Sequence, residues 1–367
     1  MSSDTDTGVA PSGPVRPLGH RQRLIWAGQA LDPDVPLYNM AHGFTIDGGL
    51  DVEAFGRAFD ALVASHDSLR TVIETGPDGP GQRILAPTTG SLEVVDLRHR
   101  PDPLSAATHW VEDRSRQRLD LERRLYHSAL LLAGPETAIW YLNQHHLICD
   151  AWSVSLLLGR QGELYQLAVD GALDGVEEGP SYLDFLEAEA EQVGSKGWNR
   201  AQAHWRAKLA KPAEPLTFYG PRPDDPGVET TRVEARIDGD RARRLAAFLE
   251  RPEVAALSPE LTAMRFFHTV LVAQLHRIGG TDRVVVGTPF HNRARRAEKR
   301  TAGLFMNLYP VVTELAPDET MASLSAKIGA EIFENLQQAR HPMAAETENG
   351  TFEVVLNYLH VPNETFG

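Results

Sequence analysis

Apolar residues recur along this chain at two spacings, one typical of strands and one typical of helices. Asp51 is placed to cap a helix in which apolar residues from Phe55 to Val63 recur at helical spacing. The flanking segments, HGFTIDG at 42–48 and SLRTVIE at 68–74, have the β-branched and aromatic composition of strands. The first part of the chain is therefore expected to alternate strand and helix.

The same two patterns predict the elements of the rest of the chain. Further strands are expected at 82–87, 92–97, 126–133, 137–146, 228–238, 282–290, 304–315 and 351–361. Helices are expected at 104–118, 152–169, 182–193, 198–210, 239–250, 259–277 and 319–339. Strand and helix are mixed in similar proportion in both halves, which predicts two related α/β lobes.

A polar, acidic, glycine-rich segment at 171–181 separates two of the predicted helices and is the expected lobe boundary. We therefore expect an N-terminal lobe at 18–175 and a C-terminal lobe at 176–367. Residues 1–17 are rich in Gly, Pro, Ser and Thr and lack the basic-then-apolar pattern of a signal peptide. They are expected to form a disordered leader.

Composition narrows the class of protein. The length of 367 residues fits two domains, and 42% hydrophobic with 23% charged residues is typical of globular chains. The net charge of −14 disfavours general binding to nucleic acid or to anionic membrane surfaces. Cys149 is the only cysteine, which excludes an internal disulfide, and no apolar stretch approaches the ~20 residues that span a bilayer. A soluble cytoplasmic protein is expected.

The segment QHHLICDAWS at 144–153 is the strongest candidate for chemistry. It lies between an apolar strand and an amphipathic helix, where a rigid sheet can hold a side chain at the mouth of a cavity. Histidine, with an ordinary pKa of about 6.5, suits proton transfer near neutral pH. Successive side chains of an extended segment point in opposite directions, so only one of His145 and His146 is expected to face the cavity.

The neighbouring residues leave several roles open. Asp150 could orient a histidine, pair with a remote arginine or cap the following helix, and its spacing favours capping. The other histidines form no spaced cluster with acids, which disfavours a metal site. Cys149 follows two apolar residues and is expected to be a buried small hydrophobe rather than a nucleophile. Ser153 lacks the nucleophile turn G-x-S-x-G and is expected to be a polar residue at the helix start.

HHLICDAWS resembles the HHxxxDG motif of the condensation domains of nonribosomal peptide synthetases, which are chloramphenicol acetyltransferase-like acyltransferases. Other segments resemble further family motifs in the same order. These are Leu18–Trp26 (like SxxQxRxW, keeping Gln22, Arg23 and Trp26), His66–Thr71 (HxSLRT), Tyr182–Phe185 (loosely YxDY), His204–Leu209 (YWxxxL), Val286–Arg293 (VGTPxxxR) and Gly303–Pro310 (GxFxNxxP). The resemblance extends from about Leu18 to His360.

The resemblance implies a V-shaped pseudo-dimer of two chloramphenicol acetyltransferase-like lobes with a tunnel between them. Two departures stand out. Ala151 replaces the usual glycine of the motif, which is acceptable at a helix start. The family also continues with further strands and a helix beyond the segment like 352–358, so the C-terminal lobe is expected to be incomplete.

The resemblance also implies a reaction. The amine of a carrier-bound aminoacyl group attacks an acyl or peptidyl thioester on another carrier protein, both presented on phosphopantetheine arms, and no metal or redox cofactor is required. His146, the second motif histidine, would position or deprotonate the amine. Asp150 would pair across the lobes with Arg293, while Asn307 and Ser153 are further candidates for structural or tunnel-lining residues, and Trp152 would pack.

Two questions stay open at this level. The basic run at 293–300 is a candidate contact for acidic carriers or a solvated loop. The same residues would also suit a free-standing ester-forming acyltransferase, or a non-catalytic module that docks carriers or other partners. Adjacent synthetase domains are expected partners under the leading interpretation.

Overall fold

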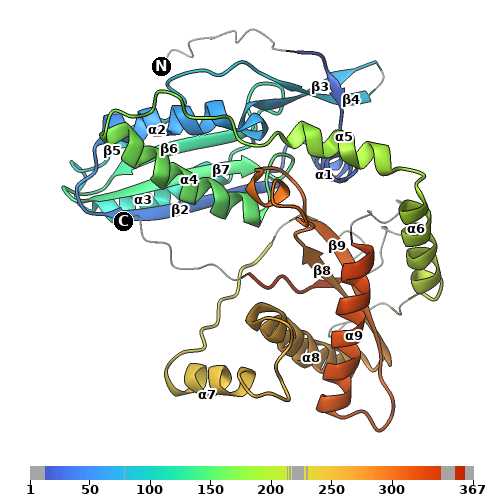
Figure 1. The fold of residues 1–367 in the computed structure, drawn as a ribbon. Helices are drawn as coiled ribbons and strands as arrows, with labels where there is room; N and C mark the ends of the chain where they lie inside the picture. The colour runs from blue at the N-terminus through green and yellow to red at the C-terminus, as the bar shows by residue number, and fades with distance from the viewer. Residues whose placement is uncertain are drawn as a thin grey trace. The chain divides into compact units, whose positions relative to one another are not determined.

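The computed structural model describes residues 13–77, 79–212, 214, 216, 227–228, 230–339 and 352–359. These residues form two compact units. Unit 1 contains the described residues up to Glu191 together with Arg293–Phe305, and unit 2 contains those from Gln192 to Asn292 and from Met306 onward. Both units combine sheet and helix (Figure 1), so the predicted mixed α/β fold is confirmed.

Unit 1 is built on a four-stranded sheet in the order β2-β7-β6-β5. The strands are β2 (Asn39–Asp47), β5 (Glu93–Asp96), β6 (Tyr126–Leu132) and β7 (Thr137–His145). The pairs β2–β7 and β6–β7 are antiparallel, and β5–β6 is parallel. The central strand β7 thus ends at His145, directly opposite Asn39 of β2.

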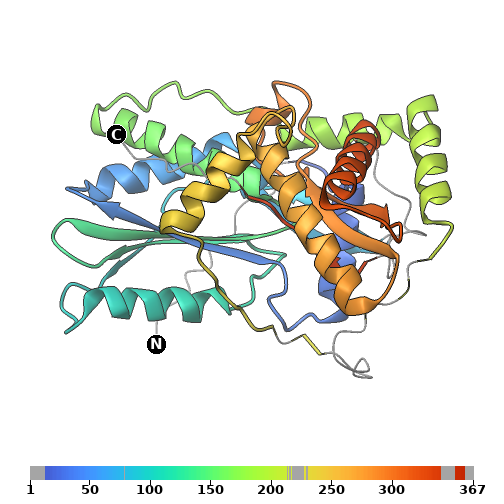
Figure 2. The same ribbon diagram turned by 90° about the horizontal axis from the view of Figure 1, so that it is seen from below.

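Helices cover both faces of this sheet. They are α2 (Val52–Ser65), α3 (Pro103–Ser115) and α4 (Ala151–Val169). Figure 2 shows α3 and α4 on opposite sides of the sheet. Side chains alternate along β7 accordingly: Trp140 and Leu142 enter the core shared with α2 and α4, whereas Tyr141 enters the core under α3. Asp51 caps α2 by accepting from the backbone N–H of Ala54 at 2.9 Å, as predicted.

A small second sheet completes unit 1. Its elements are β1 (Arg16–Pro17), β3 (Thr71–Gly76) and β4 (Gly79–Ile84), accompanied by α1 (His20–Leu31), the 3₁₀ turn Asp67–Arg70 and α5 (Tyr182–Gln192). Because β1 pairs with β4, regular structure in the described residues begins two residues before the expected start at Leu18. Residues 1–12 of the expected leader lie outside the described residues, and the expected lobe boundary between 175 and 176 stays a prediction.

Unit 2 has a three-stranded sheet in the order β10-β8-β9, packed on helices. Its elements are α6 (Lys196–Leu209), α7 (Gly239–Leu249), α8 (Pro259–Gly279), β8 (Arg283–Phe290), β9 (Asn307–Glu314), α9 (Met321–Gln338) and β10 (Val354–Val355). The strands β8 and β9 are antiparallel, and β10 pairs with β8 in parallel. Val286, Tyr309 and Ile328 are among the buried residues of its core.

Two predictions in unit 2 need correction. The expected strand at 228–238 is wrong for its described residues, none of which is in a strand, because no partner strand covers them and Val233 and Ile237 are exposed. The expected strand at 351–361 is reduced to the two residues of β10, with positions 351 and 360–361 outside the described residues.

Candidate functional site

The two histidines lie at the end of β7 and directly after it. The backbone N–H of His145 donates to Leu125 O at 2.8 Å, and that of His146 donates to Tyr38 O at 2.8 Å. The chain then turns at once, with the N–H of Ile148 donating back to His145 O at 3.0 Å. The segment 145–150, called here the histidine loop, is therefore anchored at its start by the strands on both sides of β7.

His145 is a buried structural residue. Its Nδ1 accepts from the backbone N–H of Leu147 at 3.2 Å, so its Nε2 carries the proton and donates to Gln29 Oε1 at 3.3 Å. Burial, with the nearby His146 adding to the effect, lowers the pKa of His145 to about 4. His145 is therefore neutral near pH 7, with both ring nitrogens engaged within the protein.

His146 differs from His145 in both burial and hydrogen bonding. The residue is only partly buried, and its Nδ1 has no hydrogen-bond partner within the part of the chain that the structure describes. No protein contact in that part fixes its tautomer. Of the two histidines, only His146 has a ring without a hydrogen bond to the described residues, although its Nδ1 atom is closed to solvent.

The middle of the histidine loop is held by a residue whose role the sequence did not reveal. Gln22 of α1 is fully buried, and its Nε2 lies 3.2 Å from Leu147 O and 3.0 Å from the amide oxygen of Gln82. In the sequence, Gln22 stands out only as part of a motif resemblance. Its partners are 125 and 60 residues away in sequence, so no local pattern could identify them.

Cys149 is a small hydrophobe, as predicted. It is fully buried, and its Sγ lies 3.6 Å from Met40 Sδ and 3.7 Å from His145 O. Burial raises the pKa of the thiol well above its usual value, so the reactive thiolate is suppressed. A cysteine nucleophile is not supported.

Asp150 ends the loop and begins α4. Its Oδ1 accepts from both the backbone N–H and the hydroxyl of Ser153 at 2.9 Å, which confirms the predicted capping role. Its Oδ2 accepts from Arg293 Nη1 at 2.6 Å and from the backbone N–H of Phe305 at 3.0 Å. Burial alone would raise the pKa of Asp150, but the Arg293 guanidinium and these hydrogen bonds outweigh burial and hold it below its usual value.

Arg293 is buried as completely as its partner. Its guanidinium lies 4.1 Å from the centre of the Phe305 ring, and Nη2 donates to Ser153 Oγ at 2.9 Å. Asn292, with φ of 51°, turns the chain just before it. The predicted pairing of Asp150 with Arg293 is present, but it does not cross between the two units, because Arg293–Phe305 belongs to unit 1.

Gly303 completes this cluster and requires its lack of a side chain. Its N–H donates to Ser153 Oγ at 3.0 Å, and its carbonyl lies 2.7 Å from the same oxygen, so the single hydroxyl hydrogen is shared between this carbonyl and Asp150 Oδ1. A Cβ at this position would lie 2.2 Å from the Tyr182 ring. Asp150, Ser153, Arg293, Gly303 and Phe305 together are called here the aspartate cluster.

The other predicted site residues differ in their surroundings. Asn307 begins β9 in unit 2, where its Nδ2 donates to Tyr309 OH at 2.9 Å. Ser153 is fully buried within the aspartate cluster. Trp152 is 38% exposed and donates through Nε1 to Lys299 O at 3.0 Å. The structure thus brings His145, His146, Asp150, Ser153 and Arg293 together in unit 1 and places Asn307 in the other unit.

The basic run at 293–300 is partly neutralised from within. Arg293 is ion-paired with Asp150, and Arg295 Nε lies 3.8 Å from Glu298 Oε1. Arg295 and Arg296 remain exposed.

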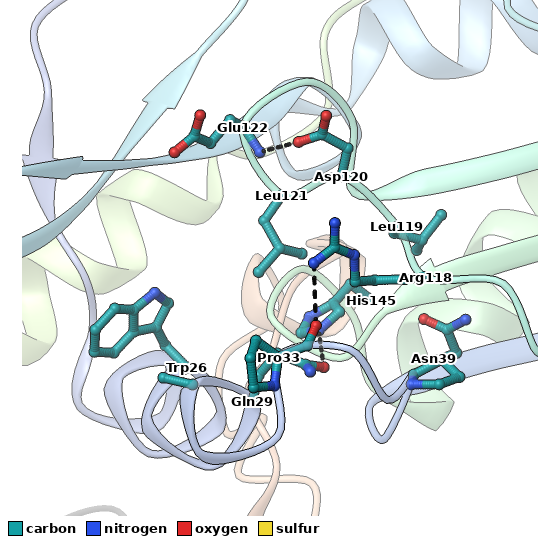
Figure 3. A pocket seen from close by; sticks show the side chains of 12 residues that line it. Trp26, Gln29, Pro33, Asn39, Arg118, Leu119, Asp120, Leu121, Glu122 and His145 are labelled. Atoms are coloured by element: carbon teal, nitrogen blue, oxygen red, sulfur yellow. Dashed lines mark hydrogen bonds between the residues drawn. The ribbon is translucent and has the colours of Figure 1, made fainter.

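A cavity of about 380 Å³ adjoins His145 (Figure 3). Its walls include Trp26 and Gln29 of α1, Pro33, and Leu119 to Leu121. His146 is not among the residues that line it. Within the described residues, no group of three or more potential metal ligands is found, and no helix has the length and apolarity to cross a membrane.

Comparison with known proteins gives a consistent result. The family model described as "Condensation domain" matches residues 14–345. The chain is 30% identical over 353 residues to phosphinothricin tripeptide synthetase PhsC of Streptomyces viridochromogenes, covering 94% of this chain and 32% of the synthetase. It is 28% identical over 320 residues to a dimodular nonribosomal peptide synthase of Bacillus subtilis, covering 85% and 13%. The chain therefore spans a third or less of these relatives.

Solved structures agree. A variant of the starter condensation domain of rhizomide synthetase in complex with C8-CoA matches with a TM-score of 0.79 and 25% identity, over 94% of this chain and 78% of that one. The first condensation domain of the CDA synthetase matches with a TM-score of 0.79 over 94% and 82%, and at 22% identity this likeness concerns the fold.

Proposed function

From the premise that the chain belongs to the condensation-domain family of nonribosomal peptide synthetases, we propose that it joins a carrier-bound acyl or peptidyl group to a carrier-bound aminoacyl group. Condensation domains catalyse amide bond formation and work with carrier-bound substrates. The relatives are multidomain synthetases, so adjacent synthetase domains are natural partners. Both substrates arrive on phosphopantetheine arms, and the reaction takes place in the cytoplasm.

The difference between the two histidines carries this proposal. His145 has both ring nitrogens engaged and a pKa of about 4, so it is a poor proton acceptor near neutral pH. His146 is partly exposed and has an Nδ1 without a partner in the described residues. We assign to His146 the role of orienting the amine and accepting its proton.

His146 alone can carry the proton that the reaction releases. The amine nitrogen attacks the thioester carbonyl carbon, and the proton that it loses passes to the His146 ring. The carbon–sulfur bond then breaks, and the departing sulfur takes up the proton as a thiol. Holding amine and thioester in a near-attack arrangement supplies much of the rate, and a positioned base contributes about 10²–10⁴-fold.

The aspartate cluster supports this chemistry from a distance. Asp150 caps α4 and ties it to Arg293 and Phe305, which fixes the end of the histidine loop. We therefore assign Asp150, Ser153 and Arg293 to structure. Asn307 stays a proposal as a tunnel-lining residue, and the exposed Arg295 and Arg296 are a proposed contact for an acidic carrier.

The experiment measures the acceptor carrier by intact-protein mass spectrometry after incubation with both loaded carriers. We expect a joined product with the wild-type chain and its loss with His146→Ala. His99→Ala, which removes an exposed histidine of unit 1, is the matched control and should retain full turnover. Equal product from wild type and His146→Ala would refute the assignment.

A further inference from the structure

Unit 1 contains a second cavity, of about 420 Å³, whose lining is rich in arginine. It lies between the C-terminal end of α3, the segment 116–124 and the adjacent ends of β6 and β7. Four arginines line it, namely Arg114, Arg118, Arg123 and Arg124, against the single carboxylate of Asp120. In a chain of net charge −14, this concentration of positive charge favours an anionic ligand.

Aromatic rings hold two of these arginines in place. Arg114 lies 5.2 Å from the centre of the Trp110 ring and donates to Gln117 Oε1 at 2.9 Å. Arg124 lies 5.3 Å from the centre of the Tyr126 ring. A guanidinium that is already oriented loses less freedom when it binds an anion.

Nearby acids neutralise only part of the charge. Glu93 binds the His127 ring at 2.9 Å and approaches Arg114 at 3.9 Å. Asp34 lies 3.5 Å from Arg118, and Asp120 Oδ1 accepts from the backbone N–H of Glu122. Arg123 and Arg124 have no ion pair within the described residues, so their charges remain uncompensated.

We propose that this cavity binds the phosphate group of a small phosphate ester. Phosphate matches the fork geometry and the charge of clustered arginines better than a single carboxylate does. The cavity has room for a phosphate and the atoms next to it. The site goes beyond the proposed amide-forming reaction and does not depend on it, because His146 does not line the cavity.

Titration calorimetry tests the site with four probes: 4′-phosphopantetheine, adenosine 5′-monophosphate, inorganic phosphate and unphosphorylated pantetheine. We expect at least one phosphate ester to bind more tightly than inorganic phosphate, and pantetheine to show no binding. The first two probes separate a pantetheine-type ligand from a nucleotide. Affinity should weaken as salt concentration rises.

Variants locate the binding. Arg123→Gln combined with Arg124→Gln should weaken the bound ester by about tenfold or more, because two charge-assisted hydrogen bonds are lost. Arg116→Gln removes the same charge from an exposed residue of the same segment that does not line the cavity, and should change affinity by less than about twofold.

Three results would overturn the proposal. They are the absence of binding for every phosphate compound, binding that survives the double variant unchanged, and an equal loss in Arg116→Gln. A His146→Ala chain should bind the ester as wild type does, so this test stands or falls separately from the condensation assay.

Discussion

Two residues of the histidine loop, His146 and Asp150, lie four positions apart and have opposite environments. His146 is partly exposed and its Nδ1 has no partner in the described residues. Asp150 is fully enclosed, and both of its oxygens accept hydrogen bonds from Ser153, Arg293 and Phe305. One short motif therefore combines the residue to which we assign proton transfer with a residue whose side chain is fully engaged in structural contacts.

This difference predicts that substitutions at the two positions should affect different properties of the protein. Changes at the aspartate end should act on stability, and changes at the histidine end should act on turnover. The predictions below challenge that division, starting with the largest expected effect.

Arg293→Ala should destabilise the protein most. It leaves the Asp150 carboxylate buried without its cation, a change that costs about 3–5 kcal/mol in the free energy of unfolding. Urea unfolding followed by circular dichroism measures the loss. Arg295→Ala, at an exposed position in the same segment, should stay within about 0.5 kcal/mol of wild type. Similar losses for the two variants would contradict the structural role of the pair.

Gly303→Ala should have the next largest effect. The new Cβ would lie 2.2 Å from the Tyr182 ring, so the cluster must shift, at a cost of about 1–3 kcal/mol. Gly49→Ala is the control, because a Cβ there meets nothing within 4 Å. Melting temperatures of the two variants give the comparison, and an unchanged value for Gly303→Ala would show that this packing is not required.

Gln22→Leu should weaken the hold on the middle of the loop. Removing the amide leaves Leu147 O and the Gln82 amide without their partner, which costs about 1–3 kcal/mol. Turnover should also fall, since the loop carries His146. Gln166→Leu, at an exposed position of α4, should leave both stability and turnover unchanged. A Gln22→Leu chain with wild-type stability would argue against this anchoring.

The last prediction concerns pH. His145 is held neutral with a pKa of about 4, against about 6.5 in the unfolded chain, so it contributes stability that is present above pH 6.5 and is lost as pH falls towards 4. Between pH 6.5 and pH 4, His145 lowers the free energy of unfolding by at most about 1.4 kcal/mol per pH unit. Urea unfolding at several pH values should show a shallower acid loss for His145→Gln than for wild type. Parallel curves would contradict the assignment, with His268 providing a common background because its pKa is also about 4.

The sequence predicted those parts of the fold that depend on local patterns. The helix after Asp51 and the strands around β7 follow from periodicity and capping, and both formed as expected. The strand expected at 228–238 did not form in its described residues, since a strand requires a partner that composition cannot specify.

The site divides in the same way. Asp150 as a cap follows from its position before α4, and its pairing with Arg293 followed from the family resemblance. The anchoring by Gln22 and Gln29 depends on partners more than a hundred residues away, and the membership of Arg293–Phe305 in unit 1 depends on tertiary packing. Neither feature can be read from the spacing of residues in the sequence.

The most direct test of the division compares His146→Ala with Asp150→Asn, measuring for each the single-turnover rate of amide formation and the melting temperature. We predict that His146→Ala keeps the wild-type melting temperature and loses about 10²–10⁴-fold in rate, whereas Asp150→Asn lowers the melting temperature markedly. A His146→Ala chain that turns over at the wild-type rate, or that melts as early as Asp150→Asn, would contradict the account.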